Sequence, residues 1–171
     1  SAVFSFPPLP AGNFRHRADY GGGALNDLGA YAVSPGRVFF GLEPDHVACR
    51  IVSRGPQVET AFVCQMTYPG GKSFTGTFGF DTGYVNRLDI LGPQLAATMD
   101  RAFTPPPDAA LTLTLNAPTG QSVQTSPPAD AFARFFSRVF AALAAGHSES
   151  FAEALLTDAR TLARLRQSAG V

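Results

Sequence analysis

A run of alternating apolar segments, separated by glycine- and proline-rich turns, occupies residues 46–91 and constrains the fold most. Its four segments have the composition and period of β-strands: His46–Ser53, Glu59–Tyr68, Lys72–Phe80 and Val85–Leu91. Pro69-Gly70-Gly71, between the second and third segments, is typical of a hairpin turn. Consecutive strands joined by such short turns pair antiparallel, so this run predicts a meander at the centre of the fold.

The second and third of these segments each have two distinct faces. One face is strongly apolar and carries Phe62, Cys64, Met66, Tyr68, Phe74, Phe78 and Phe80. The other face carries small or mildly polar residues and almost no charge: Ala61, Val63, Gln65, Thr67, Ser73, Thr75 and Thr77. Since a sheet surface left in water usually carries charged side chains, we expect helices on the first face and another subunit on the second.

Helical patterns flank the strands. From Ala24 to about Gly41 the buried candidates Leu25, Leu28, Gly29, Ala32 and Gly36 share one side, and Pro35 predicts a kink or a second short helix. Asp130 is a good N-cap for a helix whose apolar stripe comprises Phe132, Phe135, Phe136, Val139, Phe140 and Leu143, ending near Gly146. A last helix, from about Ser150 to Ser168, has Leu155, Leu162 and Leu165 as buried candidates.

Three shorter strand candidates complete the pattern, at SAVFSF, Leu111–Asn116 and Gln121–Thr125. The chain of 171 residues is long enough for one domain with an ordinary core. We therefore expect residues 1–171 to form a single α+β domain, with an open, mostly antiparallel sheet, helices packed on one face, and the other face available for dimerisation.

Charge and composition exclude several kinds of partner. Thirteen basic and thirteen acidic residues give no net charge, and no basic block attracts nucleic acid or an anionic membrane. We find no signal peptide and no apolar run long enough to span a bilayer, and we interpret Cys49 and Cys64 as buried thiols of a cytoplasmic protein. The three histidines are scattered, so the sequence predicts no metal site.

The stretch NFRHRADYGGGALNDLGAY, residues 13–31, raises the question of an active site. Gly21-Gly22-Gly23 does not fit a dinucleotide fingerprint, which needs G-x-G-x-x-G after a buried strand. Asp27 and Tyr31 are four residues apart and share one helical face, away from the apolar side. These residues leave two interpretations open: a helix start with a dipole-stabilising Asp27 and a packed Tyr31, or two groups that point into one pocket.

The stretch NFRHRADYGGGALNDLGAYAVSPGRVFFGLEP resembles a signature of the sugar oxidoreductase family that includes glucose-fructose oxidoreductase, inositol dehydrogenase and MocA-like proteins. The matching residues are Asn13, Arg15, Gly21, Gly22, Gly23, Leu25, Asp27, Gly29, Tyr31, Gly41 and Pro44. Weaker likeness continues through PGGKSFTGTFGF and SFAEALLTDARTLARLRQSAG, so it covers nearly the whole chain. The signature opens the C-terminal domain of these enzymes.

The resemblance implies a substrate-binding and dimerisation domain of an enzyme that uses NAD or NADP on a sugar or polyol. It implies that Tyr31 exchanges a proton with the substrate hydroxyl and that Asp27 is its acidic companion. It further implies that Arg15, Asn13, Gly22 and Gly23 lie at the substrate. The implied partners are a Rossmann domain, a second subunit through the sheet face and a sugar-like small molecule.

The chain departs from the complete family pattern because it contains no Rossmann half and no Glu-Lys-Pro motif. The sequence therefore predicts no cofactor site within these residues and no activity of the isolated chain. The alternative is a non-catalytic module of the same fold, standing alone or fused to another enzyme, that serves assembly or ligand binding. The sequence that precedes Ser1 in the parent gene distinguishes the two hypotheses.

Overall fold

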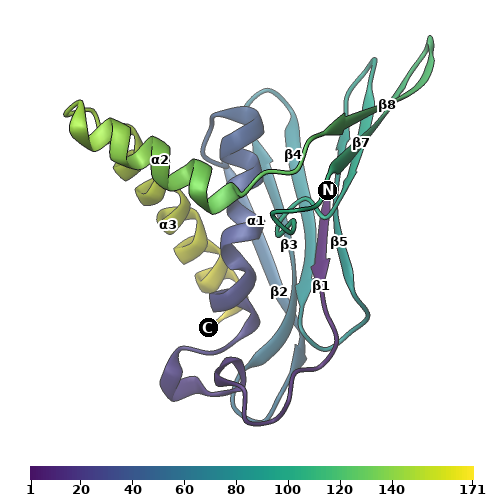
Figure 1. Ribbon diagram of the computed structural model, residues 1–171. Coiled ribbons are helices and arrows are strands. Elements are labelled where there is room, and N and C mark those ends of the chain that lie inside the picture. Colours follow the sequence, from purple (N-terminus) through teal and green to yellow (C-terminus); the bar gives the residue numbers. More distant parts are fainter. The chain divides into compact units, whose positions relative to one another are not determined.

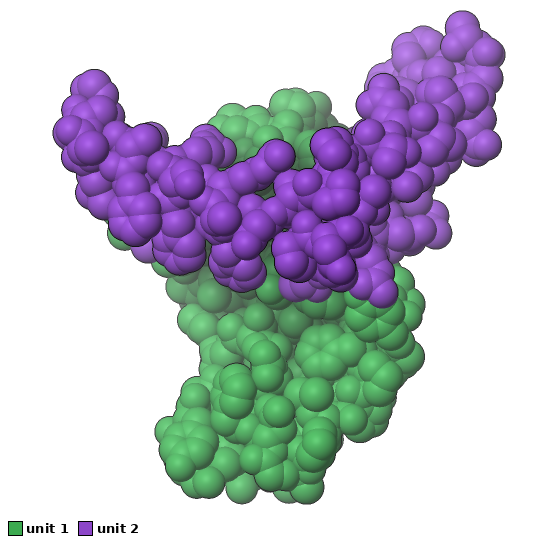
Figure 2. Space-filling view, in the orientation of Figure 1, with its two compact units in different colours: residues 1–85, 156–171 green, residues 86–155 purple.

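Eight β-strands and three α-helices follow one another in the computed structural model, which describes residues 1–171 (Figure 1). The chain forms two compact units (Figure 2). The first unit joins residues Ser1–Val85 to Leu156–Val171, and the second unit comprises Asn86–Leu155. The first unit is therefore built from both ends of the chain.

Four strands form the sheet of the first unit: β1 (Ala2–Ser5), β2 (His46–Arg54), β3 (Glu59–Tyr68) and β4 (Lys72–Gly79). They lie in the order β2-β3-β4-β1. The β2–β3 and β3–β4 pairs are antiparallel, and β1 pairs with β4 in parallel. The predicted hairpin connects β3 and β4, and Gly70 and Gly71 both adopt positive φ there, as a tight turn between twisted strands requires.

Helix α1 (Ala24–Phe40) packs on β3, β4 and β1. The predicted apolar face of the strands is buried against it, with Phe62, Met66 and Phe78 inaccessible to solvent. The predicted inner side of α1 is likewise buried. The expected second short helix after Ser34 is wrong: α1 continues through Pro35, because burial of this part of the helix outweighs the single hydrogen bond that a proline removes.

Helix α3 (Glu149–Ala169) returns the chain to the first unit and runs antiparallel to α1. Its Leu165 is fully buried, and Leu162 lies against Gly29 of α1. Arg37, in the last turn of α1, donates two hydrogen bonds of 2.8 Å to the Asp158 carboxylate. The expectation that Leu155 is buried is wrong: it is 71% exposed, because α3 joins the first unit only from Leu156 onward.

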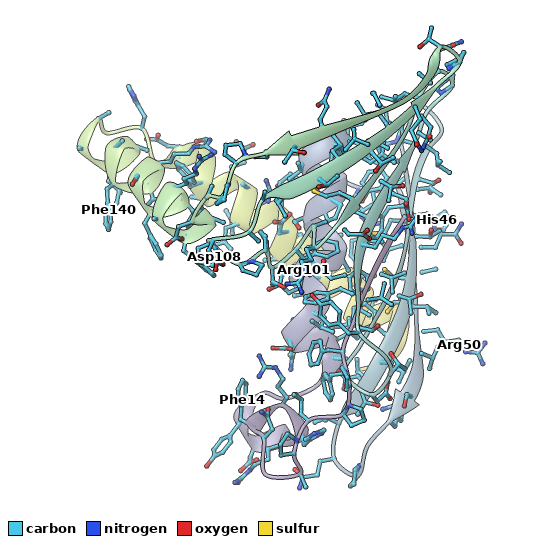
Figure 3. The ribbon with its side chains drawn as sticks, turned by 45° about the vertical axis from the view of Figure 1, so that its right-hand side comes forward. Phe14, His46, Arg50, Arg101, Asp108 and Phe140 are labelled. Carbon is cyan, nitrogen blue, oxygen red and sulfur yellow. The ribbon has the colours of Figure 1, made fainter.

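The second unit contains β5 (Val85–Leu91), β6 (Ala96–Asp100), β7 (Leu111–Ala117) and β8 (Gly120–Ser126), which pair antiparallel in chain order. Sequence reasoning missed β6, whose five residues are too short for a clear alternation. Helix α2 (Ala131–Ala144) begins where predicted, and the Asp130 carboxylate accepts a 2.9 Å hydrogen bond from the backbone N–H of Ala133. No residue of α2 is buried, and Phe140 projects from it into solvent (Figure 3).

The predicted fold class is confirmed: the protein is α+β, with a mostly antiparallel open sheet and helices on one face. No helix combines the length and the apolar character needed to cross a bilayer.

Candidate active site at the start of helix α1

A loop of two short 3₁₀ turns, Phe14–His16 and Ala18–Tyr20, leads from β1 into α1. Its backbone folds back onto itself: the N–H of Gly22 donates to the carbonyl of Arg17, and the N–H of Gly23 donates to the carbonyl of Arg15, both at 2.9 Å. The Asn13 side chain caps the first turn by accepting a hydrogen bond from the N–H of Arg15. The loop is thus closed against the start of α1.

The last two of the three glycines are needed for this closure. A Cβ atom on Gly22 would lie 2.5 Å from the carbonyl oxygen of Arg15 and 2.7 Å from that of Arg17. Gly23 has a φ of +112°, and a Cβ atom there would lie 2.5 Å from Oε1 of Glu59. Only glycine adopts this backbone conformation without strain, so the triplet shapes the junction between loop and helix.

Three of the predicted site residues meet where α1 begins. The Nε of Arg15 donates to Oδ2 of Asp27 at 2.7 Å, and both side chains are partly accessible, with 30% and 20% of their surfaces exposed. Tyr31 lies one turn further along α1, and its ring contacts Phe4 of β1 edge-on, with 5.1 Å between ring centroids. The site therefore brings together a cation, a carboxylate and a phenol that are partly shielded from water.

The surroundings of Tyr31 favour its protonated form. Burial raises the pKa of the Tyr31 phenol above its ordinary value of 10.0, the negative charge of Asp27 raises it further, and the positive charge of Arg15 opposes both. Tyr31 consequently carries its proton throughout the neutral pH range. A phenol held in this state is suited to donating a proton to an oxygen that becomes negatively charged.

The other predicted site residues have defined roles in the loop itself. Asn13, Gly22 and Gly23 shape the backbone as described, and their contact with a substrate remains a prediction. The histidines lie apart: His16 bonds the carbonyl of Leu9 and stacks edge-on against Phe80, His46 begins β2, and His147 follows α2. No three histidine, cysteine or acidic side chains are arranged to hold a metal ion.

Sequence reasoning missed Glu59, the first residue of β3. Only 9% of this residue is exposed, and Oε1 accepts a 3.1 Å hydrogen bond from the backbone N–H of Leu25 in the first turn of α1. Its signal in the sequence is a single charged residue at the start of an otherwise apolar strand.

The start of α1 does not fit the phosphates of a dinucleotide. A phosphate at a helix N-terminus is held by free backbone N–H groups of the preceding glycine-rich turn. Here the N–H groups of Gly22 and Gly23 already bond to loop carbonyls, and the Glu59 carboxylate lies at the N–H of Leu25, where a phosphate would meet another negative charge. The N–H of Gly21 is likewise bonded, to the carbonyl of Ala18, so the backbone donors of the triplet are engaged within the loop.

Several sequence relatives of the chain are named as reductases of a dTDP-linked sugar. It is 31% identical over 182 residues to a dTDP-3,4-didehydro-2,6-dideoxy-alpha-D-glucose 3-reductase of Streptomyces violaceoruber, which covers 99% of this chain and 53% of the relative. An enzyme of the same name from Actinomadura kijaniata is 34% identical over 107 residues, which cover 62% of this chain and 32% of the relative. The chain thus spans about half of the first relative, and a smaller part of the second is matched.

Solved structures of oxidoreductases also superpose on this chain. The 3-ketoreductase KijD10 of Actinomadura kijaniata, in complex with NADP and TDP-benzene, superposes with a TM-score of 0.87 at 29% identity, covering 98% of this chain and 52% of that one. An aldose-aldose oxidoreductase of Caulobacter crescentus shares the fold, with a TM-score of 0.81 at 18% identity. The sequence pattern of the GFO/IDH/MocA C-terminal domain matches residues 1–97, and the chain belongs to this family of sugar oxidoreductase domains.

Proposed function

We propose that this chain is the C-terminal substrate-binding and dimerisation domain of an NAD(P)-dependent enzyme that reduces a keto sugar carried on a nucleoside diphosphate. The observation that carries the proposal is the cluster of Arg15, Asp27 and Tyr31 beside the loop that precedes α1. Relatives named as reductases of a dTDP-linked dideoxy sugar support the choice of substrate, and the NADP bound to KijD10 supports the choice of cofactor.

In this proposal Tyr31 is the proton donor. Reduction of a ketone produces an oxygen that must gain a proton, and Tyr31 keeps its proton at neutral pH. Asp27 has two roles. Its charge favours the protonated phenol of Tyr31, and its hydrogen bond fixes the direction of the Arg15 side chain. Arg15 then presents its remaining N–H groups to oxygen atoms of the substrate, for which its fork of donors is suited.

The direct test uses the complete protein encoded by the parent reading frame. We expect it to consume NADPH or NADH when given a dTDP-linked keto sugar and to be much less active on the free sugar. A parent protein that has no dinucleotide-binding domain would contradict the proposal and favour the non-catalytic module.

The 171-residue chain alone is expected not to bind NAD(H) or NADP(H). Its only glycine triplet has its N–H groups engaged and a carboxylate beside it, so no site for a pyrophosphate remains there. Isothermal titration calorimetry with all four nucleotides checks this expectation, with the complete protein as the positive control. Micromolar binding by the isolated chain would contradict it.

The open face of the sheet in the first unit is proposed as the dimer interface. Gln65, Thr67, Thr75 and Thr77 are all exposed on it and carry no charge, and Figure 3 shows His46 and Arg50 projecting on the side of β2 away from α1. Gln65 pairs directly with Thr75, so these residues form one continuous patch. A stable interface of this kind buries on the order of 1,200–2,000 Å².

Changing Thr67 and Thr75 together to lysine is expected to convert the dimer to a monomer. Two added charges per subunit would face like charges across an otherwise uncharged contact and would lose hydration on association. Sedimentation velocity measures the result, and Ala163→Lys with Gln167→Lys, which adds the same charge to the exposed side of α3, is the matched control. A monomeric unmodified protein would show that this face has another use.

A further inference from the structure

Helix α1 lacks a cap of its own. The N-cap position is Gly23, which has no side chain to accept the N–H groups of the first turn. Oε1 of Glu59, from the neighbouring strand β3 and 34 residues away in sequence, accepts the N–H of Leu25 at 3.1 Å. The start of α1 is therefore fixed to the sheet by a side chain that is remote in sequence.

The Glu59 carboxylate fits this position closely. It lies against Gly23, where an added Cβ atom would be 2.5 Å from Oε1 and 2.9 Å from Oε2. Glu59 takes part in none of the ion pairs of the structure, so the partial positive charge of the helix N-terminus is the favourable field for this buried carboxylate. A local serine or aspartate cap would stabilise the helix equally well without tying it to β3.

Glu59 contacts Gly23, the residue at which the loop and helix α1 join. Gly23 donates its N–H to the carbonyl of Arg15, and its own carbonyl accepts the N–H of Asp27. The Arg15 side chain in turn bonds to Asp27. A displacement of Gly23 therefore moves the backbone of Arg15 and the side chain of Asp27 together, and Tyr31 follows one turn later on the same rigid helix.

We propose that Glu59 is a positioning residue, which holds the start of α1 against β3 and thereby sets the placement of Arg15, Asp27 and Tyr31 relative to a bound substrate. This inference rests on the proposed function of that cluster. Glu59 acts through Leu25 and Gly23 and does not touch the substrate.

Two variants separate position from charge. Glu59→Gln keeps the length of the side chain and an oxygen acceptor for the Leu25 N–H but removes the charge. Glu59→Asp keeps the charge but withdraws the carboxylate by one methylene. If the position of the acceptor oxygen at the Leu25 N–H matters, Glu59→Asp perturbs the arrangement of Arg15, Asp27 and Tyr31, and Glu59→Gln preserves it. The reverse order would mean that charge matters, and it would overturn the proposal.

The first measurement needs no catalysis. In the 171-residue chain, NMR of ¹³C-labelled tyrosine reports the ring of Tyr31 through its contact with Phe4, with Tyr31→Phe used to assign the signal. We expect the Tyr31 signal to shift in Glu59→Asp and to stay in place in Glu59→Gln. An unchanged signal in both variants would overturn the proposal, whether or not the complete enzyme is active on sugars.

The second measurement is turnover by the complete enzyme below its melting temperature. A misplacement of about 1 Å can cost on the order of 100-fold, so we expect kcat to fall about 10–100-fold in Glu59→Asp, with KM changed much less, and to be largely retained in Glu59→Gln. Asp130→Ala, which removes the cap of α2, is the matched control and leaves kcat unchanged. Loss of thermal stability without loss of kcat would make Glu59 a cap only.

Discussion

Replacing Tyr31 with phenylalanine in the complete enzyme is expected to lower kcat about 10²–10⁴-fold, the usual contribution of a positioned proton donor. The substitution removes only the hydroxyl group and leaves the ring that packs edge-on against Phe4. Thermal stability is accordingly expected to change by no more than roughly 1 kcal/mol. Steady-state turnover and a melting curve, measured on the same preparation, check both parts.

Tyr68→Phe is the matched control for this experiment. It removes the same group from a buried tyrosine whose ring lies against Gly36, and its hydroxyl is 3.7 Å from the sulfur of Met66. We expect kcat to be unaffected by that change. The pH dependence gives a further check: the Tyr31 pKa lies above its ordinary value of 10.0, so loss of turnover by deprotonation of Tyr31 is expected only in strongly alkaline solution. If Tyr31→Phe and the unmodified enzyme had equal turnover, Tyr31 would serve packing only and would not be the proton donor.

Gly23→Ala is expected to destabilise the 171-residue chain by about 2–6 kcal/mol. The backbone conformation at φ +112° strains any residue with a Cβ atom, at a cost of roughly 1–3 kcal/mol. The added methyl group would also meet the Glu59 carboxylate at 2.5 Å, and overpacking of this kind typically costs about 1–3 kcal/mol more. Urea denaturation followed by circular dichroism measures the change in the free energy of unfolding.

Two other glycines separate these contributions. Gly21 has a φ of +69° with open space around its Cα, so Gly21→Ala carries conformational strain alone. Gly12 has open space and an unstrained φ, and Gly12→Ala is expected to change stability little. The expected order of destabilisation is Gly23, then Gly21, then Gly12. If Gly23→Ala cost no more than Gly21→Ala, the close contact with Glu59 would be unimportant for stability.

Local patterns in the sequence were sufficient to predict most of the fold. Alternation over residues 46–91 identified four strands, and the spacing of Leu25, Leu28 and Ala32 identified the buried side of α1, because both patterns repeat within one element. Prediction was wrong where contacts between residues distant in sequence determine the structure or the burial of a side chain. Pro35 remains helical because the surrounding turn is buried, and Leu155 is exposed because α3 joins the first unit only after this residue.

The candidate site was predictable only in part, for the same reason. The four-residue spacing was enough to place Asp27 and Tyr31 on one helical face. The bond between Arg15 and Asp27 depends on how the intervening loop closes, which the glycine triplet allows but does not specify. The role of Glu59 depends on the packing of α1 against β3, which no short-range pattern in the sequence describes.

The first unit is built from both ends of the chain, and this has a consequence for biosynthesis. Translation proceeds from the N-terminus, so α1 and its sheet are made long before the segment of α3 that covers Gly29 and carries Leu165. Until that segment emerges, α1 has no cover at Gly29, and nascent chains expose apolar surface to chaperones. A premature stop codon after α2 would make this exposure permanent, although every strand and the whole Arg15–Asp27–Tyr31 cluster would already have been translated.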